Sequence, residues 1–176
     1  MEYILVVDEN DNVIGEMDNR KCHRGAGILH RAFTAMVFNR SDKLLLTQRS
    51  DLKELWPRFW DGSVSSHVHR GESYEDATRQ RLKDEIGVEV IDMEYLFKIR
   101  YQTRYENDGS ENEICAAFLV RGIDRIAPNK KEIFDYRFVS LERLVEDLRM
   151  NSKKYTPWFL LILERFLQDR VKRRNL

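Results

Sequence analysis

The order of strand and helix patterns is the feature that most constrains how this 176-residue chain folds. Short alternating or apolar runs predict strands, and longer capped runs predict helices. Strand patterns lie at 2–8, 13–17, 30–39, 44–50, 88–101, 113–121 and 136–140, and helix patterns lie at 73–87, 141–148 and 157–173. Strands dominate the middle of the chain and helices mostly follow them, which predicts an α+β fold with a mixed β-sheet.

Residues with strong end preferences mark the helix limits. Ser73 is a predicted N-cap with Asp76 three residues later, and Gly87 is a predicted C-terminal stop. Ser140 precedes the second helix pattern, and the Thr-Pro pair at 156–157 opens the last one.

Composition limits the classes of partner. Lys+Arg and Asp+Glu number 30 each, so no overall field favours nucleic acid or an anionic membrane. The length predicts a single domain over residues 1–176, which we expect to be a monomer or a weak dimer. Cys22 and Cys115 cannot form a disulfide framework, and the first ten residues do not resemble a signal peptide, which predicts a cytoplasmic protein. The apolar run at 158–163 is too short to insert across a membrane.

The segment DGSVSSHVHRGE (61–72) combines small residues and histidines, and it lies between an irregular loop predicted at 50–62 and a helix. This composition predicts a turn whose backbone approaches a ligand closely. Ser63, Ser65 and Ser66 are each candidates for a nucleophile, a phosphate donor or a plain turn residue. The residues alone leave these roles open.

Histidines and glutamates from separate segments form a candidate metal site. Glu111 and Glu113 are two apart in a strand, so they point to the same face at the start of an apolar run. Two adjacent carboxylates repel each other unless a cation or a proton lies between them. His23, His30 and His67 could complete a site of the zinc or manganese type. On spacing alone, a solvated strand end with scattered surface histidines is the more frequent explanation.

Arg49, Lys53 and Arg81 form a candidate anion site. Arginine binds phosphate oxygens at two points and lysine adds a point charge. Arg81 and Glu85 are four residues apart on one helix face, which is typical of an ion pair. The alternative is that Arg81 holds a phosphate while Glu85 holds a magnesium ion that bridges to it. The pair by itself favours the first explanation.

The aromatic residues Trp56, Trp60, Tyr101 and Trp158 are core residues by default. Trp158 occupies the second position of the last helix. It could instead present its ring face to a ligand or to a developing cation.

The segment GESYEDATRQRLKDEIGV (71–88) resembles the Nudix box, a loop–helix signature for binding diphosphate-linked substrates through divalent metals. The chain departs from this signature at Ser66, Gln80, Arg81 and Asp84, and agrees with it at Glu72, Glu85 and Gly87. Fewer acidic ligands imply fewer catalytic metals. The resemblance therefore argues against ordinary pyrophosphate hydrolysis.

Residues 3–165 are similar throughout to type I isopentenyl-diphosphate delta-isomerase, a Nudix-fold family that carries out double-bond migration. The similarity includes HRAFTAMVFN, LLLTQRSDLKELWP, RLKDEIGV, ENEIC and YTPWF. It implies a Nudix-type α/β/α sandwich with a mixed β-sheet and a small-molecule diphosphate substrate.

The resemblance also implies a role for each candidate residue. One tightly bound divalent metal (Zn, Mn or Mg) would be held by His23, His30, His67, Glu111 and Glu113. A second ion, Mg²⁺ carried by the substrate diphosphate, would bind Glu85. Diphosphate-contacting positions fall on Arg49, Lys53 and Arg81, and the aromatics around the isoprenoid fall on Tyr101 and Trp158.

Double-bond migration needs a proton added to one carbon and another removed on the opposite face, with water excluded. The resemblance implies that Glu113 exchanges one proton with Tyr101 and that a cysteine handles the other. Ser65 stands at this cysteine position. A serine hydroxyl is a much weaker acid than a thiol and needs a base beside it.

Three interpretations follow. The first is an isomerase-like enzyme that is impaired or diverged because of Ser65. The second is a Nudix hydrolase that uses Glu85 and Asp84 with metal, and the third is a non-catalytic prenyl-diphosphate binding protein. Because the other isomerase positions are retained, the resemblance favours the first and third over the second, and we adopt the first.

Overall fold

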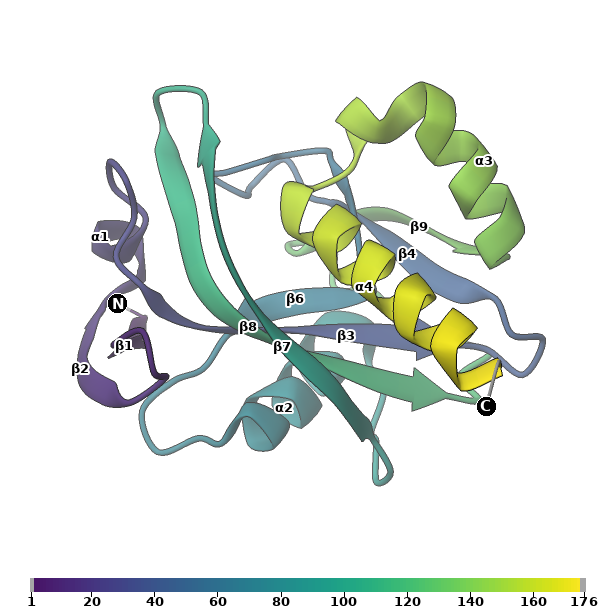
Figure 1. The fold of residues 1–176 in the computed structure, drawn as a ribbon, viewed down its shortest axis with the longest axis horizontal. Coiled ribbons are helices and arrows are strands. Elements are labelled where there is room, and N and C mark those ends of the chain that lie inside the picture. Colours follow the sequence, from purple (N-terminus) through teal and green to yellow (C-terminus); the bar gives the residue numbers. More distant parts are fainter. Residues whose placement is uncertain (1, 175–176) are drawn as a thin grey trace.

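The computed structural model describes residues 2–174, and a nine-stranded sheet runs through them (Figure 1). Its strands are β1 (Tyr3–Val7), β2 (Val13–Asp18), β3 (His30–Phe38), β4 (Leu44–Arg49), β5 (Trp60–Asp61), β6 (Val64–His67), β7 (Glu94–Tyr105), β8 (Gly109–Arg121) and β9 (Ile133–Val139). One path through the sheet runs β2-β1-β3-β4-β5. Off this path, β6 and β8 pair with β3, β7 pairs with β8, and β9 pairs with β4.

The sheet is mixed. β3 and β8 run parallel, from His30 opposite Glu113 to Phe38 opposite Arg121, whereas the other strand pairs are antiparallel. Both strands are apolar and buried over most of their length because both of their faces are covered. The predicted α+β class with a mixed sheet is confirmed.

Helices cover the two faces of the sheet (Figure 1). The helix α2 (Tyr74–Ile86) packs on one face, in a buried cluster that includes Leu82 and Phe33. The helices α3 (Leu141–Asn151) and α4 (Pro157–Arg174), joined through the 3-10 turn η1 (Ser152–Lys154), belong to the cluster on the opposite face. The predicted α/β/α sandwich is confirmed.

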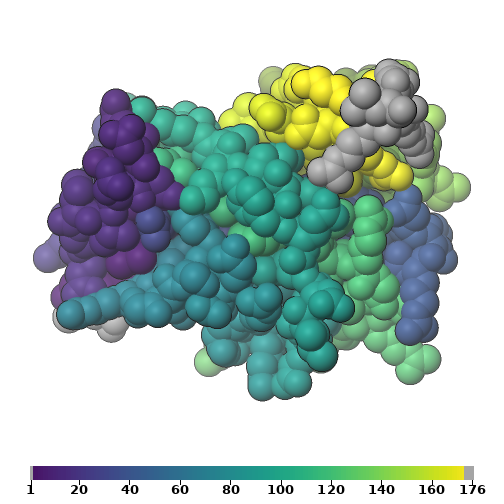
Figure 2. Space-filling model, turned by 60° about the horizontal axis from the view of Figure 1, so that its bottom comes forward, coloured from purple at the N-terminus to yellow at the C-terminus, as the bar shows by residue number. Residues whose placement is uncertain are grey.

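The N-terminal strands and α4 occupy different ends of the molecule. In Figure 2 the first strands (purple) lie at one end of the visible face, and α4 (yellow) lies towards the other. A short helix, α1 (Asn19–Cys22), connects β2 to the loop that leads into β3. Among residues 2–174, no helix is both long enough and apolar enough to cross a membrane.

The predicted helix starts and the Gly87 stop are confirmed, whereas the helix expected at 141–148 runs further, to Asn151. The Ser73 side chain accepts a hydrogen bond from the Asp76 amide, and the Asp76 side chain accepts one from Ser73, which makes a capping box. Gly87 ends α2 in the left-handed conformation, at a φ of 69°. Ser140 caps α3 through the Arg143 amide, and α4 begins at Pro157.

Several strand predictions are wrong in detail. The strand expected at 88–101 begins later and runs further, as β7. The consecutive strands expected at 30–39 and 44–50 pair with each other only at Phe38 and Leu44 in the described part of the chain, because β3 pairs instead with β6 and β8. The turn expected over 61–72 contains β6, and α1 was not predicted. Pairing with β3 overrides the local turn composition there, since the small side chains of β6 fit along the neighbouring strand.

Candidate active site

A cavity of about 690 Å³ opens over the ends of β3, β6, β7 and β8. Most of the predicted site residues line it, namely His23, Arg49, Lys53, Ser65, His67, Arg81, Tyr101, Glu111, Glu113 and Trp158. His30 and Glu85 are buried and do not contribute to its lining. Ten of the twelve predicted site residues therefore meet in one cavity.

The pairing of the strands explains this convergence. Residue His30 of β3 lies opposite Glu113 of β8, and Glu113 lies opposite Tyr101 of β7, so the three side chains share one face of the sheet. On the other side of β3, Ala32 pairs with His67 and Thr34 pairs with Ser65. These alternate positions point to the same face as His30.

Three imidazoles and two carboxylates form a compact cluster. His23, His30, His67, Glu111 and Glu113 each offer one ligand atom, and these atoms lie within 4.8 Å of one another. The three rings stand at 4.8–5.0 Å between centroids. His23 comes from the end of α1, and the Ser110 amide holds its carbonyl at 2.8 Å, which ties this loop to β8.

Backbone contacts orient two of the imidazoles. The Nδ1 atom of His23 lies 2.7 Å from the carbonyl of Asn19, and Nδ1 of His30 lies 2.7 Å from the carbonyl of Ile28. A carbonyl only accepts hydrogen bonds, so each Nδ1 carries the proton and each Nε2 has a free lone pair when the ring is neutral. This is the tautomer that a metal-binding histidine needs.

The Nε2 atoms lie close to the carboxylates, yet not every one of these buried polar atoms has a hydrogen-bond partner. His23 Nε2 lies 2.7 Å from Glu111 Oε2, and His30 Nε2 and His67 Nε2 each lie 3.3 Å from Glu113 Oε1. Among the described residues, His30 Nε2 and Glu111 Oε2 are nevertheless buried without a hydrogen-bond partner. A compact group of ligand atoms in which buried polar atoms lack hydrogen-bond partners fits a divalent cation, and three nitrogens with two oxygens suit zinc or manganese.

The charges within the cluster are strongly coupled. Burial would raise the pKa of Glu113, but the contacts with His30 and His67 hold it well below its ordinary value. Burial opposes a charge on His30, yet its contacts with Cys22 and Glu113 raise the pKa of this imidazole to about 10. A bound cation would take the place of these imidazole protons.

Glu113 also contacts Tyr101 through its second oxygen. The Tyr101 hydroxyl donates to Glu113 Oε2, whereas Glu113 Oε1 faces the two imidazoles. Burial raises the pKa of Tyr101 well above its ordinary value, and the nearby charge of Glu113 adds to this effect. Glu113 therefore joins the metal-type cluster to a buried proton donor that lines the cavity.

Ser65 lies in a separate chain of polar groups. Its hydroxyl lies 3.1 Å from Thr34 Oγ1 and donates to Asp61 Oδ1 at 3.3 Å. Thr34 in turn lies 3.6 Å from the Cys115 sulfur, and burial raises the pKa of that thiol well above its ordinary value. Sequence reasoning did not identify Asp61, because an aspartate before a glycine is common in turns.

The comparisons with known proteins concern most of the chain. Residues 28–159 match the NUDIX domain. The isopentenyl-diphosphate Delta-isomerase of Klebsiella pneumoniae is 33% identical over 93% of this chain and 89% of its own length. The protein of the same name from Haloarcula marismortui is 36% identical over 92% of this chain and 89% of its own. This chain belongs to the isopentenyl-diphosphate isomerase family of the Nudix superfamily.

Solved structures support the Nudix fold. A crystal structure from Deinococcus radiodurans superposes with a TM-score of 0.70 at 22% identity, covering 85% of this chain and 90% of that one. The NUDIX domain of Shewanella oneidensis NrtR, solved with ADP ribose, superposes with a TM-score of 0.61 at 18% identity, covering 88% and 94%. These likenesses concern the fold alone.

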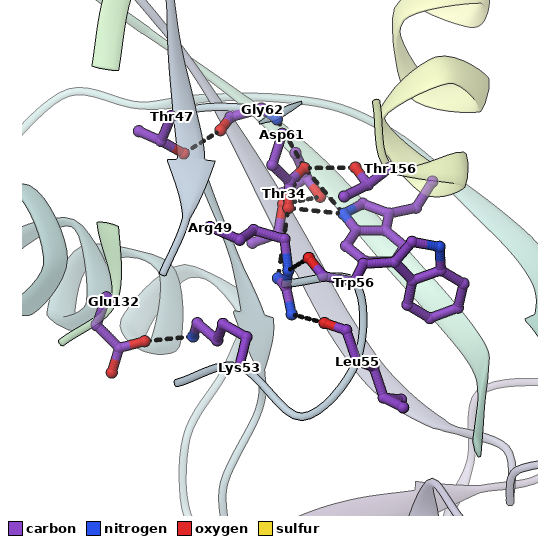
Figure 3. A network of polar contacts seen from close by, with 12 residues as sticks. Thr34, Thr47, Arg49, Lys53, Leu55, Trp56, Asp61, Gly62, Glu132 and Thr156 are labelled. Carbon is purple, nitrogen blue, oxygen red and sulfur yellow. Dashed lines mark hydrogen bonds and ion pairs between the residues drawn. The ribbon is translucent and has the colours of Figure 1, made fainter. Parts of the chain in front are cut away.

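In this Nudix fold, carboxylates occupy two of the three predicted diphosphate contacts. Lys53 forms an ion pair with Glu132, a residue that sequence reasoning missed (Figure 3). Arg81 lies 2.9 Å from Glu85 and 3.6 Å from Glu132. The ion pair expected between Arg81 and Glu85 is present, and burial raises the pKa of Glu85. The roles of Glu85 with magnesium and of Arg81 with phosphate stay predictions.

Arg49 is held differently from the other two cations. Its guanidinium donates to the carbonyls of Leu55 at 2.9 Å and Trp56 at 3.1 Å (Figure 3). It also lies 3.7 Å from Asp61 Oδ2 and 5.3 Å from the ring centroid of Trp158. Arg49 therefore presents a fixed charge to the cavity.

The aromatic residues divide into two groups. Tyr101 and Trp158 line the cavity, whereas Trp56 and Trp60 do not. Trp56 packs edge-on against Trp158, with 5.1 Å between ring centroids, and thus supports it from behind. Trp60 is covered by the Arg137 guanidinium, 4.4 Å from its ring centroid. Trp56, Tyr101 and Trp158 are all buried in one core cluster and Trp60 packs against it, so the expected core positions are confirmed, and Tyr101 and Trp158 also line the cavity.

Proposed function

We propose that this protein is an isopentenyl-diphosphate isomerase-like enzyme that interconverts isopentenyl and dimethylallyl diphosphate. The observation that carries the proposal is that Glu113, Tyr101 and Ser65 line the same cavity as the cations Arg49, Lys53 and Arg81. The names of the relatives support the same substrate class. The protein would act as a single cytoplasmic domain, without nucleic acid or membrane partners.

The diphosphate would bind to Arg49, Lys53 and Arg81. To reach Lys53 and Arg81 it must displace or share the carboxylate of Glu132, which contacts both cations. Arginine and lysine favour an anion that carries more charge than one carboxylate. Magnesium carried by the diphosphate would bind Glu85, which lies beside Arg81.

One divalent ion would be held by His23, His30, His67, Glu111 and Glu113. When bound, it supplies a fixed positive charge that orients the carboxylates and lowers their proton affinity. Glu113 can then share a proton with Tyr101, to which it is hydrogen-bonded. This pair would serve one face of the substrate alkene.

The charge that develops on the substrate carbon requires an aromatic face and a dry site. Trp158 lines the cavity, and its indole nitrogen is bound to Asp61, which fixes the ring. Its π-face would stabilise a carbocation-like state. Ser65 would manage the proton on the opposite side of the substrate, more slowly than a thiol because its hydroxyl is a weaker acid.

One observation disfavours the hydrolase alternative. Asp84, which that alternative needs together with Glu85, accepts a hydrogen bond from Gln80 on the exposed side of α2 and does not line the cavity. A non-catalytic prenyl-diphosphate binder remains the second candidate, because Ser65 is the one proton-transfer position that departs from the family resemblance.

The experiment is an incubation of the metal-loaded protein with isopentenyl diphosphate and, separately, with a panel of nucleoside and prenyl diphosphates. Product formation and released phosphate are both followed. The proposal expects slow formation of dimethylallyl diphosphate and no phosphate release. Phosphate release without isomerisation supports the hydrolase, and binding without either product supports the binder.

A further inference from the structure

Asp61 is a buried carboxylate that contacts two cavity-lining residues, Trp158 and Ser65, and fixing the Trp158 ring accounts for only the first contact. It ends β5 and is 3% exposed. Its Oδ1 accepts hydrogen bonds from the Gly62 amide at 2.7 Å and the Thr156 hydroxyl at 2.9 Å (Figure 3). The Trp158 indole donates to the same oxygen at 2.9 Å. The Ser65 hydroxyl donates to the same oxygen.

Burying a carboxylate is costly, and holding α4 in place does not by itself require a charge. A neutral acceptor could bind Thr156 and Trp158. The nearest cation, Arg49, lies 3.7 Å from Oδ2, and its stronger contacts go to backbone carbonyls. Burial raises the pKa of Asp61, although Arg49 and the surrounding donors oppose this shift. Asp61 is therefore a stronger base than an exposed carboxylate.

The carboxylate also fixes the direction of the Ser65 hydroxyl. An ionised carboxylate can only accept, so Ser65 must donate its proton to Asp61. The lone pairs of Ser65 Oγ are then free for Thr34, 3.1 Å away, and for the cavity that Ser65 lines. His67 cannot serve as this base while its Nε2 faces Glu113. Asp61 supplies the base that a serine needs.

We propose that Asp61 is the positioning base of Ser65, and that the Asp61–Ser65 pair replaces a thiol as the second proton-transfer group. This inference rests on the proposed isomerase function. As Ser65 Oγ bonds to the departing proton at C2 of isopentenyl diphosphate, its own hydroxyl proton passes to Asp61. The C–H electron pair becomes the new double bond.

The remaining atoms balance across the cavity. The former alkene electron pair binds the proton held between Glu113 and Tyr101. These two residues therefore lose one proton, and Asp61 gains one. Exchange of both groups with solvent water resets the enzyme. The reverse reaction uses the same groups in the opposite sense.

A structural role for Asp61 makes a different prediction from a role as base. The test compares Asp61→Asn in the native chain and in Ser65→Cys, using isopentenyl diphosphate and metal-loaded protein. In the native chain, kcat should fall by about 10²-fold or more, the range for one acid–base group. In Ser65→Cys the same change should cost less than about 10-fold, because a thiol ionises near neutrality without a carboxylate.

The matched control is Asp147→Asn. Asp147 is also a hydrogen-bonded carboxylate, on Tyr155 and Asn151, but it lies outside the cavity lining. It should leave kcat unchanged in both backgrounds. Equal losses from Asp61→Asn in both backgrounds would show that Asp61 only holds Trp158 and Thr156, and would overturn the proposal.

The pH dependence of kcat gives a second readout if Asp61→Asn does not fold. The charged or titratable groups that face Asp61 are Arg49 from β4 and Cys115 from β8. The native chain and Ser65→Cys share these groups and the metal-type residues, so a difference between their pH profiles does not come from them. The acidic limb of the native chain should follow the Asp61 carboxyl, whereas that of Ser65→Cys should follow the thiol and so lie at higher pH. The role of Asp61 would be overturned if both proteins showed the same acidic limb. It would also be overturned if the native chain had no activity while Ser65→Cys was active. Silence of both proteins would instead overturn the proposed isomerase function.

Discussion

At the scale of the residue, Glu132 holds a position that a diphosphate would use. Its carboxylate contacts Lys53 and Arg81, and although burial opposes ionisation, these two cations hold the pKa of Glu132 below its ordinary value. It is therefore charged at neutral pH. It competes with the substrate for the same cations.

Replacing Glu132 by glutamine should remove this competition while keeping the side-chain shape. We expect inorganic pyrophosphate with Mg²⁺ to bind more tightly by about 1 kcal/mol, the scale of a partly exposed ion pair. Isothermal calorimetry measures this. Glu54→Gln is the control, because Glu54 lines the same cavity but pairs with Arg20. Weaker binding by Glu132→Gln would mean that Glu132 holds the magnesium instead.

Arg81→Glu should have the opposite effect, measured on isopentenyl diphosphate. The change removes a charge-assisted contact, so binding of isopentenyl diphosphate should weaken by about 1.5–3 kcal/mol. Arg79→Glu on the same helix is the control, since Arg79 does not line the cavity. An unchanged affinity in calorimetry would leave Arg81 as the ion-pair partner of Glu85 alone.

The sequence predicted the roles of some site residues and not of others. Spacing alone did not favour a metal site, and only the resemblance joined His23 to Glu113 across the chain. Asp61 and Glu132 carried no motif, and their importance arises from contacts with Ser65 and Lys53 that folding creates. Lys53 and Glu132 are 79 residues apart, so no local pattern relates them.

At the scale of the element, helix starts and the strands β1 to β4 followed from local sequence patterns, whereas β6 did not. The capping box of α2 involves residues three apart, and so it is visible in the sequence. β6 exists because it pairs with β3, and its composition alone suggested a turn. Strand pairing depends on partners that local sequence does not contain.

Gly87→Ala tests the C-terminal end of α2. Gly87 has a φ of +69°, and an added Cβ would lie 2.8 Å from the Cβ of Ala127. The free energy of unfolding should fall by about 2 kcal/mol or more, from backbone strain plus the clash. Urea titration measures this. Gly71→Ala, at a φ of +82° with open space, isolates the backbone strain and should cost less. Equal losses would exclude the clash.

At the scale of the whole molecule, the cluster of His23, His30, His67, Glu111 and Glu113 joins α1, β3, β6 and β8. Because the unfolded chain has no such site, metal binding should stabilise the fold. Protein purified without chelators should contain about one divalent ion per chain by elemental analysis. Chelation should lower Tm, and added zinc or manganese should restore it. No metal and no change in Tm would refute the site.

The exchange of one atom at residue 65 tests the central claim most directly. Ser65→Cys should raise the rate of conversion of isopentenyl to dimethylallyl diphosphate by about 10²-fold or more, since a positioned thiol is a far better proton carrier. Alkylation should abolish the gain selectively, because Cys22 and Cys115 are buried, at 0% and 1% exposed. The account predicts a slow native protein and a fast, alkylation-sensitive variant. A native protein that is already fast, with Ser65→Ala equally fast, would contradict it.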